Sequence, residues 1–244
     1  MELWGITNNG KVRWQNQDVF KILFDEDRGI AVLVVCDGMG GANAGNVASA
    51  LAADTFMHHI GKYIEGAGSI DEIAEELSNA VIAANAAVYD KSAREDEYAG
   101  MGTTLAAAIS TTDGEVVVNI GDSRVYFADQ IDITQITRDH SVVEDMVRRG
   151  DLTRDEARFH PSKHLITRAL GTSRVEKPDV FRLSLLSGEY LLLCSDGLSN
   201  VLYDSEMFTA LQSCTTVREC CENLVAMALS RGAPDNVTAV VFRK

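Results

Sequence analysis

The chain has 244 residues, 46% of them hydrophobic, and a formal net charge of −14. This length and apolar content suffice for one large hydrophobic core, and the negative charge without a basic stripe argues against nucleic acid as a partner. Since no apolar run is long enough to span a membrane and no signal-peptide pattern is present, we expect a cytoplasmic protein that is not attached to a membrane.

The first predicted elements are one buried strand and two long helices. Residues 30–36 form an apolar run that ends at Asp37-Gly38, which is typical of a strand inside a sheet. Apolar residues then recur with helical spacing over 47–60 and over 73–88. The second helix follows the capping-box pattern Ser69-Ile70-Asp71-Glu72, which marks its start.

Further strands and one charged segment follow. Strands are predicted at 103–109, 115–120 and 124–127. Residues 139–170 are instead charged and helical, with a helix stop at Gly150 and a second capping box from Thr153 to Glu156. Because this segment interrupts a series of strands, we interpret 139–170 as an inserted flap.

The remaining elements are again strands and helices. They are predicted as strands at 180–185 and 190–194, helices at 205–212 and 217–231, and a last strand at 237–242. Strands, two helices, strands and two helices in this order indicate a layered α+β fold instead of alternating βαβ units. Because no linker, repeat or low-complexity block divides the chain, we expect residues 1–244 to form a single domain.

Four aspartates flank predicted strands, each next to glycine or another small residue. Asp37, Asp122 and Asp196 follow strands, and Asp235 precedes the last one. If these strand ends lie side by side, the carboxylates raise each other's pKa, so such a cluster usually holds a divalent cation. Oxygen ligands favour Mg²⁺ or Mn²⁺ over zinc or copper. The pattern therefore predicts a metal site.

The glycine-rich turn Asp37-Gly38-Met39-Gly40-Gly41 allows two interpretations. One is a phosphate-binding nucleotide loop, but the lysine and the Ser/Thr of a P-loop are absent, and Ala42-Asn43-Ala44 provides no cation. We favour the other, in which the glycines permit a tight turn and the Gly38 carbonyl binds a metal beside the Asp37 carboxylate.

Arg13 lies five residues before Asp18. Its guanidinium could hold two phosphate oxygens while Asp18 faces the metals. Taken alone, the pattern fits an ordinary surface arginine better, so the phosphate role depends on the other motifs.

Six ordered motifs resemble one family, the metal-dependent protein phosphatases of type 2C. The motifs are Arg13…Asn16-Gln17-Asp18, Asp37-Gly38-Met39-Gly40-Gly41, Gly102-Thr103-Thr104, Gly121-Asp122-Ser123-Arg124, Ser195-Asp196-Gly197-Leu198 and Asp235-Asn236-Val237-Thr238. Met39 and the stretch from Asp139-His140-Ser141 to Gly171 resemble the stand-alone bacterial branch of that family.

The resemblance implies a four-layer α-β-β-α sandwich, in which two antiparallel sheets are flanked by helix pairs. It also implies that Asp37 bridges two tightly bound Mn²⁺ or Mg²⁺ ions, that the Gly38 carbonyl binds one of them, and that Asp196 and Asp235 complete the other. Asp122 would hold a weaker third ion together with Asp196. Asp18 would act through metal-bound water, and Arg13 would bind the phosphate.

Two residues depart from the pattern of many eukaryotic relatives. Met39 stands where they carry a histidine proposed as the general acid, and Gln17 stands where some carry glutamate. Methionine cannot donate a proton, so a metal-bound water or another group must protonate the leaving oxygen. Three histidines, His140, His160 and His164, lie in the predicted flap, where capping or surface roles are favoured over catalysis.

The predicted function is a protein serine/threonine phosphatase in which a metal-activated water hydrolyses phosphoserine or phosphothreonine. A binding module without activity would have lost metal ligands, whereas all are present here. A small-molecule phosphoesterase would share the metals but need a closed pocket. We expect phosphorylated proteins made by a serine/threonine kinase as signalling partners, a monomer, and five cysteines that are core hydrophobes in a reducing cytoplasm.

Overall fold

The computed structural model describes residues 1–41, 44–64 and 69–244, and in these residues the strands form two antiparallel sheets. The first sheet has the order β1 (Glu2–Asn8), β11 (Val237–Arg243), β10 (Tyr190–Cys194), β7 (Arg124–Ala128), β8 (Ile133–Gln135). The second has the order β2 (Asp18–Asp25), β3 (Ile30–Met39), β5 (Leu105–Ser110), β6 (Glu115–Ile120), β9 (Asp179–Leu183), and β4 (Gly102–Thr103) pairs with β3.

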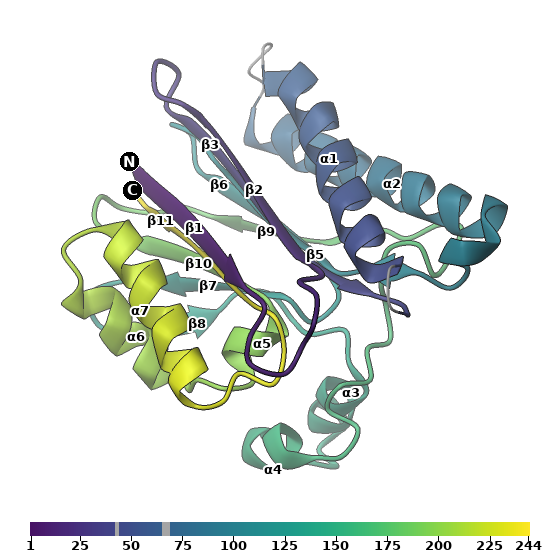
Figure 1. Cartoon of the computed structure of the whole chain (residues 1–244). Coiled ribbons are helices and arrows are strands. Elements are labelled where there is room, and N and C mark those ends of the chain that lie inside the picture. The colour runs from purple at the N-terminus through teal and green to yellow at the C-terminus, as the bar shows by residue number, and fades with distance from the viewer. Residues whose placement is uncertain (42–43, 65–68) are drawn as a thin grey trace.

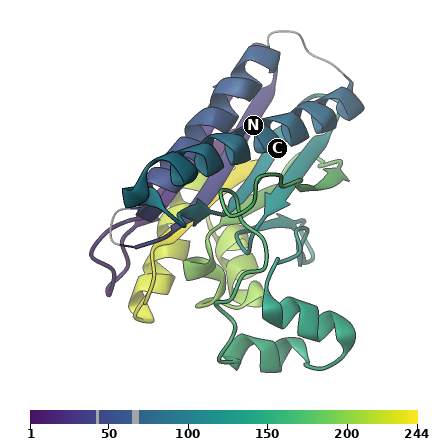
Figure 2. The same ribbon diagram turned by 90° about the vertical axis from the view of Figure 1, so that its right-hand side faces the viewer.

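Helices cover the outer face of each sheet (Figures 1 and 2). The helices α1 (Ala44–Ile64) and α2 (Ile70–Arg94) lie on the second sheet, and a short 3₁₀ turn, η1 (Asp96–Tyr98), follows them. The helices α5 (Asp196–Ser199), α6 (Asp204–Ser213) and α7 (Val217–Ser230) lie on the first sheet. The predicted α+β sandwich of two antiparallel sheets flanked by helices is thus confirmed.

Strand β3 shows why its sequence is almost continuously apolar. Val32, Val34 and Cys36 pack toward α1 and α2, whereas Ala31, Leu33 and Val35 pack against the other sheet. Side chains alternate between the faces of a strand, so a strand buried on both faces needs apolar residues at every position. This packing fixes the end of the strand, where Asp37 lies.

Segment 139–170 carries two short helices, α3 (Val142–Arg149) and α4 (Arg154–Phe159), which lie apart from the four layers in Figure 1. Gly150 ends α3 in the left-handed conformation, with φ of 80°, and the capping box between Thr153 and Glu156 begins α4 as predicted. Only Val143 of these helices is buried. Few apolar contacts therefore hold these two helices to the body.

The observed elements differ from the predicted ones mainly at the N-terminus. Strands β1 and β2 were not predicted, because both are edge strands whose residues are mostly half-buried without a clean alternation. Helices α1 and α2 extend beyond 47–60 and 73–88, since a helix continues past its last buried turn. Ala42 and Asn43 of the glycine-rich turn lie outside the described residues. Over the described chain, no helix combines the length and apolarity needed to cross a membrane.

Candidate functional site

Residues from both sheets meet at one end of the sandwich and line a cavity of about 490 Å³. The lining includes six of the seven predicted site residues, which are Arg13, Asp37, Gly38, Asp122, Asp196 and Asp235. Asp37 lies at the end of β3, Asp122 in the turn from β6 to β7, and Asp196 at the start of α5. Residues that are up to 222 positions apart in sequence are therefore brought together by the contact of the two sheets.

The carboxylates of the cavity disfavour one another's charged forms. Burial, followed by the nearby Asp18 and Asp196 carboxylates, raises the pKa of Asp37 well above its ordinary value. Burial, followed by Asp196, has the same effect on the pKa of Asp122. The pKa of Asp196 is also raised, by burial and then by Asp235. A divalent cation would relieve this repulsion, so the electrostatics fit a Mg²⁺ or Mn²⁺ site.

Asp18 is the seventh predicted residue, and it lies behind the cavity, paired with Asp37 in the β2–β3 register. It is 4% exposed, and its Oδ2 accepts hydrogen bonds from Ser195 Oγ and Thr238 Oγ1, both at 2.6 Å. Burial raises the pKa of Asp18 to about 7, although both hydroxyls oppose this shift. Its Oδ1 has no partner within the described chain. An unpaired buried acceptor fits a water molecule bound to a cation.

Close backbone contacts at two glycines shape the cavity wall. A Cβ atom at Gly38 would lie 2.0 Å from the Gly45 carbonyl oxygen, and one at Gly197 would lie 1.8 Å from the Asn236 carbonyl oxygen. Only glycine allows these approaches. A larger residue at position 38 would therefore displace the backbone, and with it the Gly38 carbonyl.

Several polar residues that the sequence analysis left without a role hold the site in place. Thr104 Oγ1 accepts the Asp37 N–H at 2.9 Å, and Thr103 Oγ1 donates to the Asp37 carbonyl at 2.9 Å. The Asn236 side chain donates to the carbonyls of Asn9 and Gln15, and so fixes the loop that carries Arg13. The motifs containing these residues are their only signal in the sequence, because the contacts depend on the folded arrangement.

Arg13 makes an ion pair that the sequence did not predict. Its Nη2 lies 2.7 Å from Asp235 Oδ2, while Asp235 Oδ1 accepts the Asn236 N–H at 2.9 Å. The hydrogen bond to Asp235 raises the pKa of Arg13. Among residues 1–41, 44–64 and 69–244, no three His, Cys, Asp or Glu side chains come close enough together to hold a metal by themselves. Mg²⁺ and Mn²⁺ commonly use one or two carboxylates with water, which this site can supply.

Residues of segment 139–170 hold the turn that contains Asp122 in place. Arg124 binds Asp139 through two nitrogens, with the shorter contact at 2.6 Å from Nη2 to Oδ2. His140 Nδ1 accepts the Gly121 N–H at 3.0 Å. A second cavity of about 390 Å³ lies beyond Asp122, between α4 and the start of α6, and shares Asp122 and Asp196 with the first. Segment 139–170 thus adjoins the carboxylate cluster.

Comparison with known proteins identifies relatives that cover the whole molecule. A family model described as Protein phosphatase 2C matches residues 11–228. A "Serine/threonine phosphatase stp" of Listeria monocytogenes is 34% identical over 238 residues, which are 98% of this chain and 94% of the relative. "Protein phosphatase PhpP" of Streptococcus pneumoniae is 33% identical over 242 residues, 99% of this chain and 96% of the relative.

Two solved structures share the fold. The serine/threonine phosphatase of S. agalactiae superposes with a TM-score of 0.90 at 32% identity, covering 100% of this chain and 99% of the other. The catalytic domain of the phosphatase PstP in complex with two manganese ions superposes with a TM-score of 0.84 at 36% identity, covering 98% and 96%.

Proposed function

The chain belongs to the protein phosphatase 2C family and is a metal-dependent protein serine/threonine phosphatase, and we propose that the carboxylate cavity is its active centre. The observation that carries this assignment is the meeting of Asp37, Asp122, Asp196 and Asp235 with Arg13 in one cavity. Asp37, the Gly38 carbonyl, Asp196 and Asp235 would hold two Mn²⁺ or Mg²⁺ ions. Asp122 and Asp196 would hold a third, weaker ion. The relative bound to two manganese ions supports the first pair.

Arg13 binds and orients the phosphate group. Its side chain is 54% exposed, so the guanidinium can reach a phosphate carried by another protein. Binding requires Arg13 to exchange its ion pair with Asp235 for phosphate oxygens, which accept two parallel hydrogen bonds from a guanidinium. This exchange leaves Asp235 free to act as a ligand.

Asp18 and its hydroxyl partners hold water in the cavity. The unpaired Oδ1 of Asp18 accepts a hydrogen bond from the attacking water and so orients it. When bound, the metal ions lower the pKa of water and neutralise charge on the phosphate. The phosphate monoester is then hydrolysed by direct attack of water, without a covalent intermediate on the protein.

Segment 139–170 forms a flap that contacts the protein substrate, within a single domain of residues 1–244. Support comes from its second cavity beside Asp122 and from the few buried residues of α3 and α4. The substrates are phosphoproteins made by a serine/threonine kinase in a bacterial signalling pathway. The five cysteines are free and buried, which supports a reducing cytoplasm, where the protein acts as a monomer.

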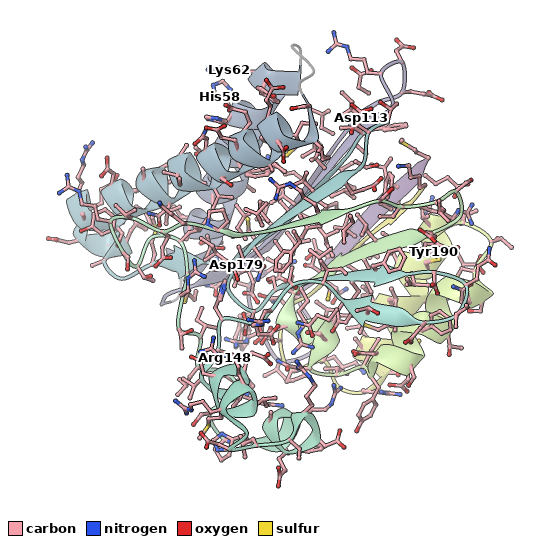
Figure 3. The ribbon with its side chains drawn as sticks, turned by 180° about the vertical axis from the view of Figure 1, so that it is seen from behind. His58, Lys62, Asp113, Arg148, Asp179 and Tyr190 are labelled. Atoms are coloured by element: carbon pink, nitrogen blue, oxygen red, sulfur yellow. The ribbon has the colours of Figure 1, made fainter. Side chains whose placement is uncertain are left out.

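The proposal is tested by metal removal and by ligand variants. Chelation should abolish hydrolysis of a phosphoserine peptide, and Mn²⁺ or Mg²⁺ should restore it. Asp37→Ala and Asp196→Ala should each lower kcat by orders of magnitude and also lower the metal content, measured by calorimetric titration. Full activity in chelator would refute the assignment. Asp113→Ala (Figure 3) is the matched control, because Asp113 is exposed and precedes β6, at the other end of that strand from Asp122.

A further inference from the structure

The three histidines of segment 139–170 lie in different surroundings. Both ring nitrogens of His140 make polar contacts within the fold. Nδ1 accepts the Gly121 N–H, and Nε2 lies 3.3 Å from the Asp179 carboxylate. His160 Nδ1 accepts the Ser162 N–H at 3.1 Å and so closes a local turn. His164 is exposed, lines the 490 Å³ cavity, and has no hydrogen-bond or ion-pair partner in the described chain. Structural roles therefore account for His140 and His160 but not for His164.

His164 lies within electrostatic reach of the carboxylate cluster. Burial and then Asp235 raise the pKa of Asp196, and a charge on the His164 ring lowers it. The charged groups that share the cavity with it come from several elements, and they are Arg13, Asp37, Asp122, Lys163, Asp196 and Asp235. The connection between α4 and β9 carries the imidazole, which lines the same cavity as Arg13.

In the metal-loaded enzyme the cavity carboxylates would be ionised ligands, and the other side chains of the cavity are poor proton donors for a leaving alkoxide. Met39 carries no acidic proton, and the Gln17, Asn200 and Asn236 amides are not acids at neutral pH. The Thr104 hydroxyl is already bonded to Ser123 Oγ at 2.7 Å and is buried. Guanidinium and ammonium groups keep their protons through neutral pH. An imidazole ordinarily exchanges its proton in this range, which suits a general acid.

We propose that His164 is the general acid that protonates the seryl or threonyl oxygen as it leaves, an inference that rests on the proposed function. The water oxygen forms the new bond to phosphorus, and the bond from phosphorus to the side-chain oxygen breaks with its electron pair on that oxygen. The His164 imidazolium gives its proton to this oxygen. The neutral imidazole regains a proton from the attacking water through solvent, so the products are the free hydroxyl and inorganic phosphate.

The test compares leaving groups in the Mn²⁺-loaded enzyme. A seryl oxygen leaves poorly without a proton, whereas 4-nitrophenolate needs none. His164→Asn should therefore lower kcat on a phosphoserine peptide by about 100-fold, with KM within about twofold, because general acids contribute on this scale. Turnover of 4-nitrophenyl phosphate should change less than about threefold. Across aryl phosphates with increasingly basic leaving groups, the loss should grow steadily.

Two controls separate proton donation from a structural or docking role. His58→Asn, on the exposed face of α1 (Figure 3), should leave every substrate unaffected. Free imidazole should restore part of the peptide activity of His164→Gly. Three results would overturn the inference: a decrease in kcat that is equal for all leaving groups, a change in KM alone, or no rescue of His164→Gly by imidazole. A wild-type enzyme that hydrolyses no phosphomonoester with Mn²⁺ would instead refute the proposed function.

Discussion

Replacing Asp18 with asparagine tests whether a residue proposed to act in catalysis destabilises the folded protein. Asp18→Asn keeps the shape of the side chain, and its amide oxygen can still accept hydrogen bonds from Ser195 and Thr238. The variant cannot ionise, however. Since burial raises the pKa of Asp18 to about 7, the charged form costs free energy in the folded protein when no cation is present.

The sign and size of the effect follow from proton linkage. A carboxylic acid whose folded pKa lies above its ordinary value of 3.8 stabilises the fold fully below that value, and this contribution is lost as pH rises through about 7. Each pH unit in this window corresponds to about 1.4 kcal/mol. In chelator, the free energy of unfolding of wild type should therefore fall by about 2 to 3 kcal/mol relative to that of Asp18→Asn between pH 5 and pH 8.

The assay is urea denaturation in chelator, followed by circular dichroism at pH 5 and pH 8. The free energy of unfolding of the variant should increase relative to that of wild type as pH rises. With Mn²⁺ at pH 8 the variant should be stabilised less by the metal and should hydrolyse phosphopeptide more slowly. A difference in unfolding free energy that does not change with pH would refute the raised pKa of Asp18.

Further outcomes are expected for four variants. Arg13→Ala should raise KM for a phosphopeptide about tenfold or more while calorimetry shows nearly unchanged Mn²⁺ binding, because a guanidinium is not a metal ligand; loss of the tight metals would contradict the role given to Arg13. Asp122→Ala should keep two tight Mn²⁺ sites yet turn over phosphopeptide poorly, and three unchanged sites in the titration would contradict this. Arg158→Ala should lower kcat/KM for a phosphoprotein more than for an aryl phosphate, since Arg158 Nη2 binds the Leu202 carbonyl at 2.7 Å and joins the flap to the body. Among the described residues, the exposed Arg148 (Figure 3) makes only a local ion pair, with Asp145, so Arg148→Ala should act in the same sense but more weakly. Equal losses on both substrates would mean that the flap supports the catalytic centre itself.

Much of the fold could be predicted because its central strands are buried on both faces. Strand β3 and the equally apolar β10 appear in the sequence as continuous apolar runs, which are typical of strands buried on both faces. The edge strands β1 and β2 lack such runs, since solvent and partial burial permit mixed residues. Helix starts at Ser69 and Thr153 were predictable because a capping box is a local interaction.

The site was predictable to the extent that function restricts residue type. Aspartates beside glycine at strand ends were visible in the sequence, and Asp37 and Asp196 do line one cavity. The ion pair of Arg13 with Asp235 and the hydroxyl contacts of Asp18 were not visible, because they join residues more than 170 positions apart. Such contacts depend on how the two sheets pack.

The position of β11 makes activity depend on pairing between distant parts of the sequence. This strand lies between β1 and β10 inside the first sheet, and the segment that leads into it carries Asp235 and Asn236. A nascent chain that ends before β11 therefore has an incomplete sheet, an unpaired β1 and an unanchored Arg13 loop. Pairing over such long sequence separations forms late in folding. Newly made molecules should thus be unable to remove phosphate from their neighbours until the sandwich has closed.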